Sequence, residues 1–292
     1  MDIRTRACLA LSRKMMAPPE EKMADHSAYG EWRDASLVSS WKHFADSEIA
    51  GRDVLDFGCG DGQLAFFLAQ KNLANSITGV DIDLPAIARA KARLADHPEM
   101  SDTLRFLEGD ERGLPVPDAS VDVVTAFDCM EHVMQPEPIL ADWQRVLRPG
   151  GRVLIEWFPF KGPWGPHMEA LVPVPWAHVV FGQRAMFRTA EAIYDDPRFV
   201  PRHWDLDEKG QKKPNKWKQW ERFDEQAYVN ELDIASFRRM VKDAGLTVAR
   251  LDRYGFGKGG VKKAIGDALM AIPVLGEYAT SYTIVALEKP AP

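Results

Sequence analysis

Short apolar runs alternate with amphipathic stretches through the middle of the chain. The apolar runs are residues 54–58, 76–81, 104–110, 121–128 and 152–158. The amphipathic stretches between them, with helical periodicity, are residues 63–71, 84–95 and 139–147. Buried strands that alternate with helices are typical of βαβ units. The pattern therefore predicts an α/β protein with a doubly wound, mostly parallel sheet and helices on both faces.

Two segments interrupt this alternation in the C-terminal half. Residues 159–230 contain many prolines and five of the nine tryptophans, and residues 255–280 separate the last two predicted strands. The later elements are a helix at 234–244 and strands at 246–253 and 281–289. Residues 1–50 are predicted to be mainly helical, with a turn at Pro18-Pro19 and an amphipathic helix from Tyr29 to Phe44. The expected division is an N-terminal helical cover (1–50), a core (51–158), an insertion (159–230) and a C-terminal part of the core (231–292) with a helical insertion at 255–280.

The composition bears on which partners the protein binds and on the compartment in which it is found. The chain has 292 residues, 46% of them hydrophobic, with 43 acidic and 37 basic side chains and a net charge of −6. This acidic balance disfavours a nucleic-acid partner. Three widely spaced cysteines favour a reducing cytoplasm, and because no C-x-x-C or H-x-x-x-H pair is present, no metal site is predicted. No run approaches the ~20 apolar residues that span a bilayer.

A glycine-rich loop, Asp56-Phe57-Gly58-Cys59-Gly60-Asp61-Gly62, follows the first predicted strand. Glycines there permit a sharp turn and a close approach of a ligand to the backbone, although a tight strand-to-helix turn alone would explain them. The acidic side chains of Asp56 and Asp61 suit a cationic ligand better than a pyrophosphate. Asp81 ends the second strand, where a carboxylate can accept ribose hydroxyls, and Asp110 ends the third.

Taken in order, these motifs resemble those of class I S-adenosylmethionine-dependent methyltransferases. DFGCGDG (56–62) resembles the family's acidic G-x-G-x-G motif, and GVDID (79–83) resembles its ribose-binding motif. EGDERGLPVPDASVDVV (108–124) resembles the adenine-contacting segment, and LRPGGRVLI (147–155) the turn into the fifth strand. The resemblance implies a Rossmann-like sheet of seven strands, with the last strand antiparallel between the fifth and sixth. It also implies S-adenosylmethionine as the cofactor.

The resemblance assigns roles to residues around the cofactor. The three glycines of the loop would line the methionine moiety, Asp81 would hold the ribose, and Asp110 would receive the adenine amino group. Asp128 and Cys129 would lie near the sulfonium, and Arg33 of the N-terminal cover would meet the cofactor carboxylate. The complete expected cofactor set is Asp56, Gly58, Cys59, Gly60, Gly62, Asp81, Ile82, Asp110, Glu111, Asp128 and Cys129.

Two histidines are candidates for proton transfer to or from an acceptor. His132 follows the fourth strand, and an imidazole titrates near neutrality, as a general base requires; it could equally be a packing residue at a helix start. His167 lies in a Gly-Pro-rich loop. It could line an acceptor pocket or pack in a small core under the insertion. Cys59 and Cys129 lack an obvious activating base and are interpreted as packing residues.

The leading hypothesis is methyl transfer to a small-molecule, sugar or lipid-like acceptor, with oxygen as the favoured target. Transfer or cyclisation of the aminocarboxypropyl chain, which releases methylthioadenosine, and a non-catalytic cofactor-binding subunit remain alternatives. The basic, Trp-rich run at 202–222 is either a solvated surface or a pocket for an anionic or sugar-like acceptor. Residues 258–276 either rest on a membrane surface or, as we favour, form a helix that closes the core. The oligomeric state stays open.

Overall fold

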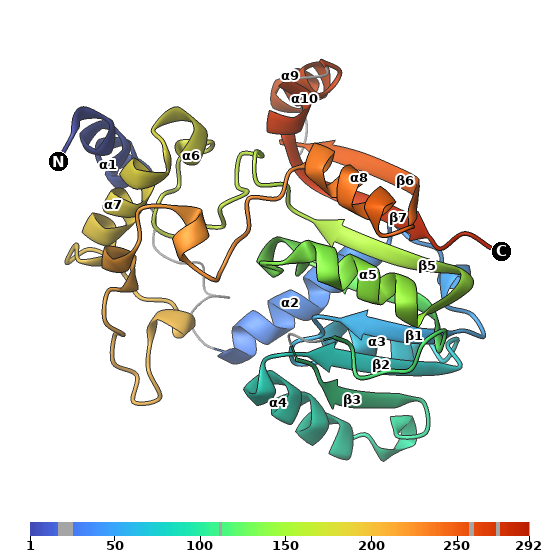
Figure 1. Ribbon diagram of the computed structural model, residues 1–292. Coiled ribbons are helices and arrows are strands. Elements are labelled where there is room, and N and C mark those ends of the chain that lie inside the picture. The colour runs from blue at the N-terminus through green and yellow to red at the C-terminus, as the bar shows by residue number, and fades with distance from the viewer. Residues whose placement is uncertain (17–25, 111–112, 257–259, 273–274, 292) are drawn as a thin grey trace. The chain divides into compact units, whose positions relative to one another are not determined.

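The computed structural model describes residues 1–16, 26–110, 113–256, 260–272 and 275–291 (Figure 1). These residues form two compact units, each assembled from three segments. The first unit comprises residues 1–32, 158–233 and 254–282, and the second comprises residues 33–157, 234–253 and 283–292. This division differs from the expected one in two respects. The N-terminal cover is split between the units, and the helical insertion at 255–280 belongs to the first unit.

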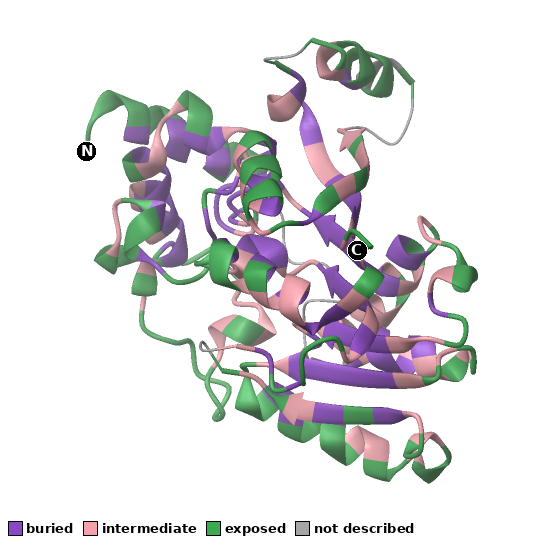
Figure 2. Ribbon diagram, turned by 45° about the vertical axis from the view of Figure 1, so that its right-hand side comes forward, coloured by how far each residue is buried: buried purple, intermediate pink, exposed green. Residues whose placement is uncertain are grey.

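The second unit is built on a seven-stranded sheet. Its strands are β1 (Asp53–Phe57), β2 (Ser76–Asp81), β3 (Leu104–Glu108), β4 (Val121–Phe127), β5 (Leu147–Trp157), β6 (Thr247–Gly255) and β7 (Thr280–Glu288). They lie in the order β3-β2-β1-β4-β5-β7-β6, and β7 runs antiparallel to β5. The predicted sheet, with its last strand between the fifth and the sixth, is confirmed. Figure 2 shows that most of this sheet is buried.

Helices cover both faces of the sheet because successive strand side chains point to opposite faces. On one face, α2 (His26–Trp41), α3 (Gln63–Gln70) and α4 (Leu84–Ala95) pack onto the sheet through one apolar cluster. On the other face, Trp143 of α5 (Pro136–Val146) meets Phe57 with ring centroids 5.3 Å apart. Phe237 of α8 (Ile234–Asp243) packs against Trp157 in the same way, at 4.9 Å.

Most predicted elements of this unit appear within a few residues of their expected ends, with one exception. A turn was expected at Arg148–Gly151, but β5 begins at Leu147 and runs through this segment. The pairing with β4 shifts register between Val121 and Val123, so the extra residues form an irregularity in the strand instead of ending it. The short turns of this unit are η2 (Asp46–Glu48), η3 (Pro98–Met100) and η4 (Met130–His132).

The first unit is mainly helical. Its helices are α1 (Ile3–Met15), α6 (Ala177–Val180), α7 (Gln183–Tyr194), α9 (Gly260–Met270) and α10 (Leu275–Tyr278), with turns η5 (His203–Asp205), η6 (Lys216–Gln219) and η7 (Phe223–Glu225). Cys8 and Leu9 of α1 join Phe187 and Ile193 of α7 in a single apolar core. Sequence reasoning missed α7, although its apolar positions recur with helical spacing, because the prolines around it masked the period.

The insertion at 255–280 contributes little to a core. Ile265 of α9 is 50% exposed, and Lys263 pairs with Asp267 on the solvent side at 2.6 Å, so the expectation that this helix closes the core is wrong. Lys258 and the predicted turn at Pro18-Pro19 lie outside the described residues. Among the residues that are described, no helix combines the length and apolar character needed to cross a bilayer.

Candidate cofactor site

The glycine loop joins β1 to α3 in a conformation that only glycine fits. Gly58 and Gly62 have left-handed φ angles of +68° and +81°. A Cβ on Gly58 would lie 2.8 Å from the Cβ of Cys129, and one on Gly62 would lie 2.6 Å from the ring of Phe106. Both the backbone angle and the packing therefore exclude a side chain at these two positions.

The loop is tied to the neighbouring strand by hydrogen bonds. The amide of Gly58 donates to the carbonyl of Val80 at 2.9 Å, and the amide of Gly60 donates to Oδ2 of Asp81 at 2.7 Å. Asp81 also accepts from the amide of Asp83 at 2.8 Å. The carboxyl ends of β1 and β2 are thus locked together, at the edge where open α/β sheets bind ligands.

A small cavity of about 60 Å³ lies beside this loop. It is lined by Arg33, Leu37, Asp56, Gly58, Cys59, Gly60, Gln63, Leu64 and Phe127. The sequence singled out the glycines, Cys59, Asp56 and Arg33, but it missed Leu37, Gln63, Leu64 and Phe127. These four residues belong to helices and a strand. The periodicity of those elements predicts which positions face the core, but it does not predict which of them line a cavity.

Asp56 places an incompletely bonded carboxylate at this cavity. Its Oδ1 accepts a hydrogen bond from the hydroxyl of Thr125 at 2.8 Å, whereas Oδ2 is buried without a hydrogen-bond partner. Burial raises the pKa of Asp56 to about 7, and the charge of Asp81 acts in the same direction. A buried polar atom that lacks a partner is costly. A cationic donor from a ligand would satisfy this oxygen and restore the carboxylate charge.

Arg33 brings the opposite charge to the same cavity. Its guanidinium pairs with Asp128 at the end of β4. Asp128 has a left-handed φ of 53°, a strained conformation for a residue other than glycine. The cavity thus combines a cation and a carboxylate, and this pair matches a zwitterionic amino acid.

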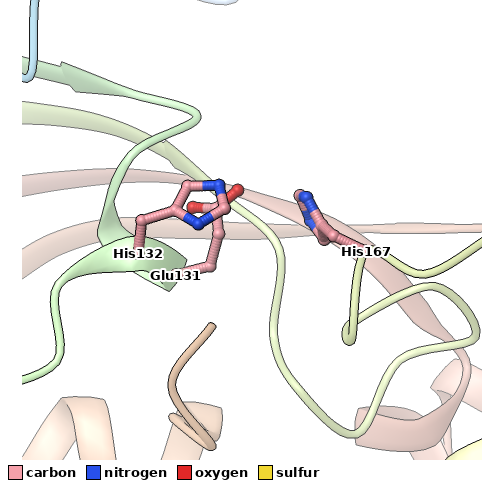
Figure 3. Close-up of side chains that lie close together, drawn as sticks. All are labelled: Glu131, His132 and His167. Carbon is pink, nitrogen blue, oxygen red and sulfur yellow. The ribbon is translucent and has the colours of Figure 1, made fainter. Parts of the chain in front are cut away.

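Further carboxyl groups gather at the ends of β4 and β5. Glu131 lies in η4 next to His132 (Figure 3), and burial together with the adjacent charge of Asp128 raises its pKa well above the usual range. Glu156 in β5 is also buried, and this raises its pKa, while a hydrogen bond to Ser40 opposes the shift. Sequence reasoning assigned neither glutamate a role. Glu156 could have been noticed in the sequence, because an acidic residue inside an otherwise apolar strand is unusual.

The residues expected near the adenosine lie along the ends of β2 and β3. Ile82 is an apolar side chain that is 68% exposed beside Asp81, and Asp110 is exposed after β3. Glu111 lies outside the described residues. The sequence suggested that Asp61 suits a cationic ligand. In the structure its carboxylate instead pairs with the guanidinium of Arg89 in α4 at 2.7 Å.

The two cysteines of the site are unsuited to nucleophilic chemistry. Burial raises the pKa of the Cys59 thiol far above its usual value, and the negative charges of Asp56 and Asp81 raise it further. Burial likewise raises the pKa of the Cys129 thiol, reinforced by the charge of Glu131. Both thiols therefore stay protonated at neutral pH and act as small packing groups.

The two candidate histidines belong to different units. His132 ends η4, directly after β4, and its side chain is partly exposed. His167 lies in the first unit, in the loop that precedes α6, with a left-handed φ of 52° and its ring edge-on to Phe158 at 5.1 Å.

Comparison with known proteins gives matches to part of the chain. Residues 55–155 match the family described as "Methyltransferase domain". A probable S-adenosylmethionine-dependent methyltransferase of Mycolicibacterium smegmatis is 40% identical over 106 residues, which cover 36% of this chain and 38% of that protein. The 27-O-demethylrifamycin SV methyltransferase of Amycolatopsis mediterranei is 38% identical over 136 residues, which cover 44% and 49% respectively. The chain thus spans less than half the length of these two curated relatives.

A solved structure agrees on the fold. The S-adenosylmethionine-dependent methyltransferase of Mesorhizobium loti superposes with a TM-score of 0.51 at 15% identity, covering 89% of this chain and 97% of that one. At this level of sequence identity the likeness shows the fold alone, and the match to the methyltransferase family does not extend outside residues 55–155.

Proposed function

We propose that this protein transfers the methyl group of S-adenosylmethionine to an oxygen atom of a small-molecule acceptor. The observation that carries the proposal is the pair of opposite charges in the cavity, with Arg33 on one side and the unsatisfied Oδ2 of Asp56 on the other. The methionine end of the cofactor carries a carboxylate and an ammonium group, which match this pair. Asp81 and Ile82 would hold the ribose and adenine.

The cofactor supplies an activated methyl group when it is bound, so the protein's main task is positioning, which can contribute ~7–11 kcal/mol. The fixed backbone of the Gly58–Gly62 loop and the apolar walls, Leu37 and Phe127, orient the cofactor and exclude water. A hydroxyl acceptor must also lose a proton. His132, at the carboxyl end of β4, is the proposed general base for that step.

Two observations support a small-molecule acceptor over nucleic acid. The net charge of −6 is unfavourable for a polyphosphate partner. The Amycolatopsis relative acts, by its name, on 27-O-demethylrifamycin SV, which favours a small acceptor and a bond to oxygen. The expected cytoplasmic location is part of this proposal. The three cysteines, all within the described residues, are free thiols, as a reducing compartment permits.

The test is to incubate the purified protein with S-adenosylmethionine labelled with ¹³C in the methyl group and to resolve the products by mass spectrometry. We expect S-adenosylhomocysteine and a labelled methyl ether when hydroxylated acceptors are added. Methylthioadenosine formed without any acceptor would overturn the proposal in favour of chemistry on the aminocarboxypropyl chain. Methylation of carbon or nitrogen would overturn only the assignment to oxygen.

A further inference from the structure

A hairpin in the first unit brings two turns together. Residues 205–213 fold back on themselves through hydrogen bonds from the amide of Asp207 to the carbonyl of Gln211 and from the amide of Lys213 to the carbonyl of Asp205, both at 2.8 Å. The hairpin therefore places η5, which starts after Arg202, beside the chain that leads into η6. Side chains far apart in sequence share one surface as a result.

The base of this hairpin is anchored on α7. The hydroxyl of Tyr194 donates to the carbonyl of Lys213 at 2.9 Å, and Nδ2 of Asn215 donates to the carbonyl of Glu191 at 3.0 Å. Asn215 also caps η6 by accepting from the amide of Trp217 at 3.1 Å. Because α7 is buried in the core of its unit, this surface has a rigid support.

Two cations on this surface form no direct ion pair with any described residue. In the described part of the chain, neither Arg202 nor Lys216 lies within ion-pair distance of a carboxylate. Burial lowers the pKa of both side chains, and the charge of Asp205 opposes this shift in each of them. Glu169 also opposes the shift at Arg202, whereas Lys213 adds a positive charge that lowers the pKa of Lys216 further. The nearest acid, Asp205, already accepts from the amide of Arg202 at 3.0 Å, where it caps η5.

Aromatic rings stand beside these cations. The guanidinium of Arg202 lies 6.0 Å from the ring centre of Trp204, and Nζ of Lys216 lies 5.2 Å from that of Trp217 and 5.6 Å from that of Tyr228. Trp204 and Tyr228 are 41% and 45% exposed. Large aromatic side chains with this exposure offer flat apolar surface to a ligand.

We propose that Arg202, Lys213 and Lys216 form an anion-binding site whose ligand carries a phosphate or carboxylate group next to a ring. Arg202 and Lys216 form no direct ion pair with the residues that the structure describes, and an anionic ligand would give both cations charge-assisted hydrogen bonds. Trp204, Trp217 and Tyr228 would pack against the ring. The proposal that an anion binds at this site is independent of the proposed function. Only the further step, that this ligand is the methyl acceptor, rests on the proposed function.

The experiment uses phenyl phosphate, which joins a dianion to one ring, and phenol as its neutral counterpart. Binding to the full chain is measured by titration calorimetry without cofactor. We expect phenyl phosphate to bind and phenol not to bind, and we expect Arg202→Gln and Lys216→Gln each to weaken phenyl phosphate binding at least about tenfold. Lys209→Gln removes the same charge from the exposed tip of the same hairpin and should leave the affinity unchanged.

Two results would overturn the site. One is the absence of phenyl phosphate binding to the wild-type chain, and the other is an equal loss in Lys209→Gln, which would indicate a diffuse positive field. Far-ultraviolet circular dichroism of each variant checks that it is folded. Because the titration contains no S-adenosylmethionine, its outcome is independent of whether methyl transfer occurs, and the two proposals can fail separately.

Discussion

Arg33 of α2 forms an ion pair with Asp128 at the end of β4, across 95 positions of the sequence. The pair places the only arginine of the cavity lining among three buried or half-buried acids, Asp128, Glu131 and Glu156. It also ties the part of α2 that belongs to the second unit to the carboxyl end of β4. Arg33 therefore compensates the charge of these acids, and we propose that it also presents a cation to the cofactor carboxylate.

We predict that Arg33→Met weakens S-adenosylmethionine binding by about ten- to a hundredfold, because a charge-assisted hydrogen bond contributes ~1.5–3 kcal/mol. The variant should also melt at a lower temperature at pH 8 than the wild type, since the acids then repel one another without compensation. Calorimetric titration and thermal unfolding test both effects. Arg89→Met, which removes a surface ion pair with Asp61, is the matched control and should bind normally.

The pKa of Asp56, about 7, makes cofactor binding pH-dependent. Only the ionised carboxylate attracts the ammonium group, so affinity should fall by up to about tenfold for each pH unit below 7. The slope should vanish in Asp56→Asn, which we expect to bind weakly at every pH. Titrations between pH 5.5 and 8 would contradict this prediction if wild type and variant showed the same slope.

Asp56 should also destabilise the cofactor-free protein at high pH. Its folded-state pKa is raised above the ordinary value of 3.8, so its contribution to stability is fully present below pH 3.8 and is lost as pH rises through 7. Asp56→Asn should therefore unfold at a higher urea concentration than the wild type at pH 8, with a smaller difference at pH 5. Asp61→Asn serves as the control, because its carboxylate is paired with Arg89.

Alanine substitutions at Gly60 and Gly62 allow the cost of backbone strain to be measured separately from the cost of a steric clash. Both have left-handed φ angles, but a Cβ on Gly62 meets Phe106 at 2.6 Å, whereas one on Gly60 meets nothing closer than 3.8 Å. Gly60→Ala should cost ~1–2 kcal/mol of unfolding free energy, and Gly62→Ala clearly more. Adding Phe106→Leu to Gly62→Ala should recover part of the loss, and no recovery would count against the packing explanation.

His132→Ala should lower turnover by ~10²-fold or more if the imidazole is the general base. Cofactor affinity should be unchanged, because His132 does not line the cavity. Turnover is followed as S-adenosylhomocysteine release with a saturating hydroxyl acceptor. His97→Ala, at an exposed histidine in the same unit, provides the comparison, and equal turnover in the two variants would eliminate His132 as the base.

His178 makes the first unit sensitive to acid. Its ring is buried against Phe160, and burial lowers its pKa from 6.5 to about 4. The unfolded chain binds the proton more readily, so stability falls as pH drops from 6.5 towards 4, by up to ~3 kcal/mol. In His178→Phe this loss should disappear from urea unfolding curves. An unchanged pH dependence would show that other groups cause it.

The sequence by itself determined the mostly parallel sheet, the approximate positions of its strands and the glycine loop. These features depend on local rules, namely apolar runs, helical periodicity and the backbone freedom of glycine at Gly58 and Gly62. It also indicated Asp56 and Asp81, because a carboxylate at the end of a parallel strand is placed by the topology alone. The expectation of S-adenosylmethionine as the cofactor came from the resemblance of this ordered set of motifs to those of methyltransferases.

Only the tertiary structure decided how charges are paired and which side chains are desolvated. From the sequence, Asp61 was expected to suit a cationic ligand, but in the structure its carboxylate pairs with Arg89. The sequence placed Glu156 in a strand, and only the structure shows that its carboxyl group is buried. The helix α7, hidden among prolines, supports the hairpin that gathers Arg202 and Lys216. Ion pairing and burial depend on contacts between residues that are distant in the chain, and no local pattern encodes those contacts.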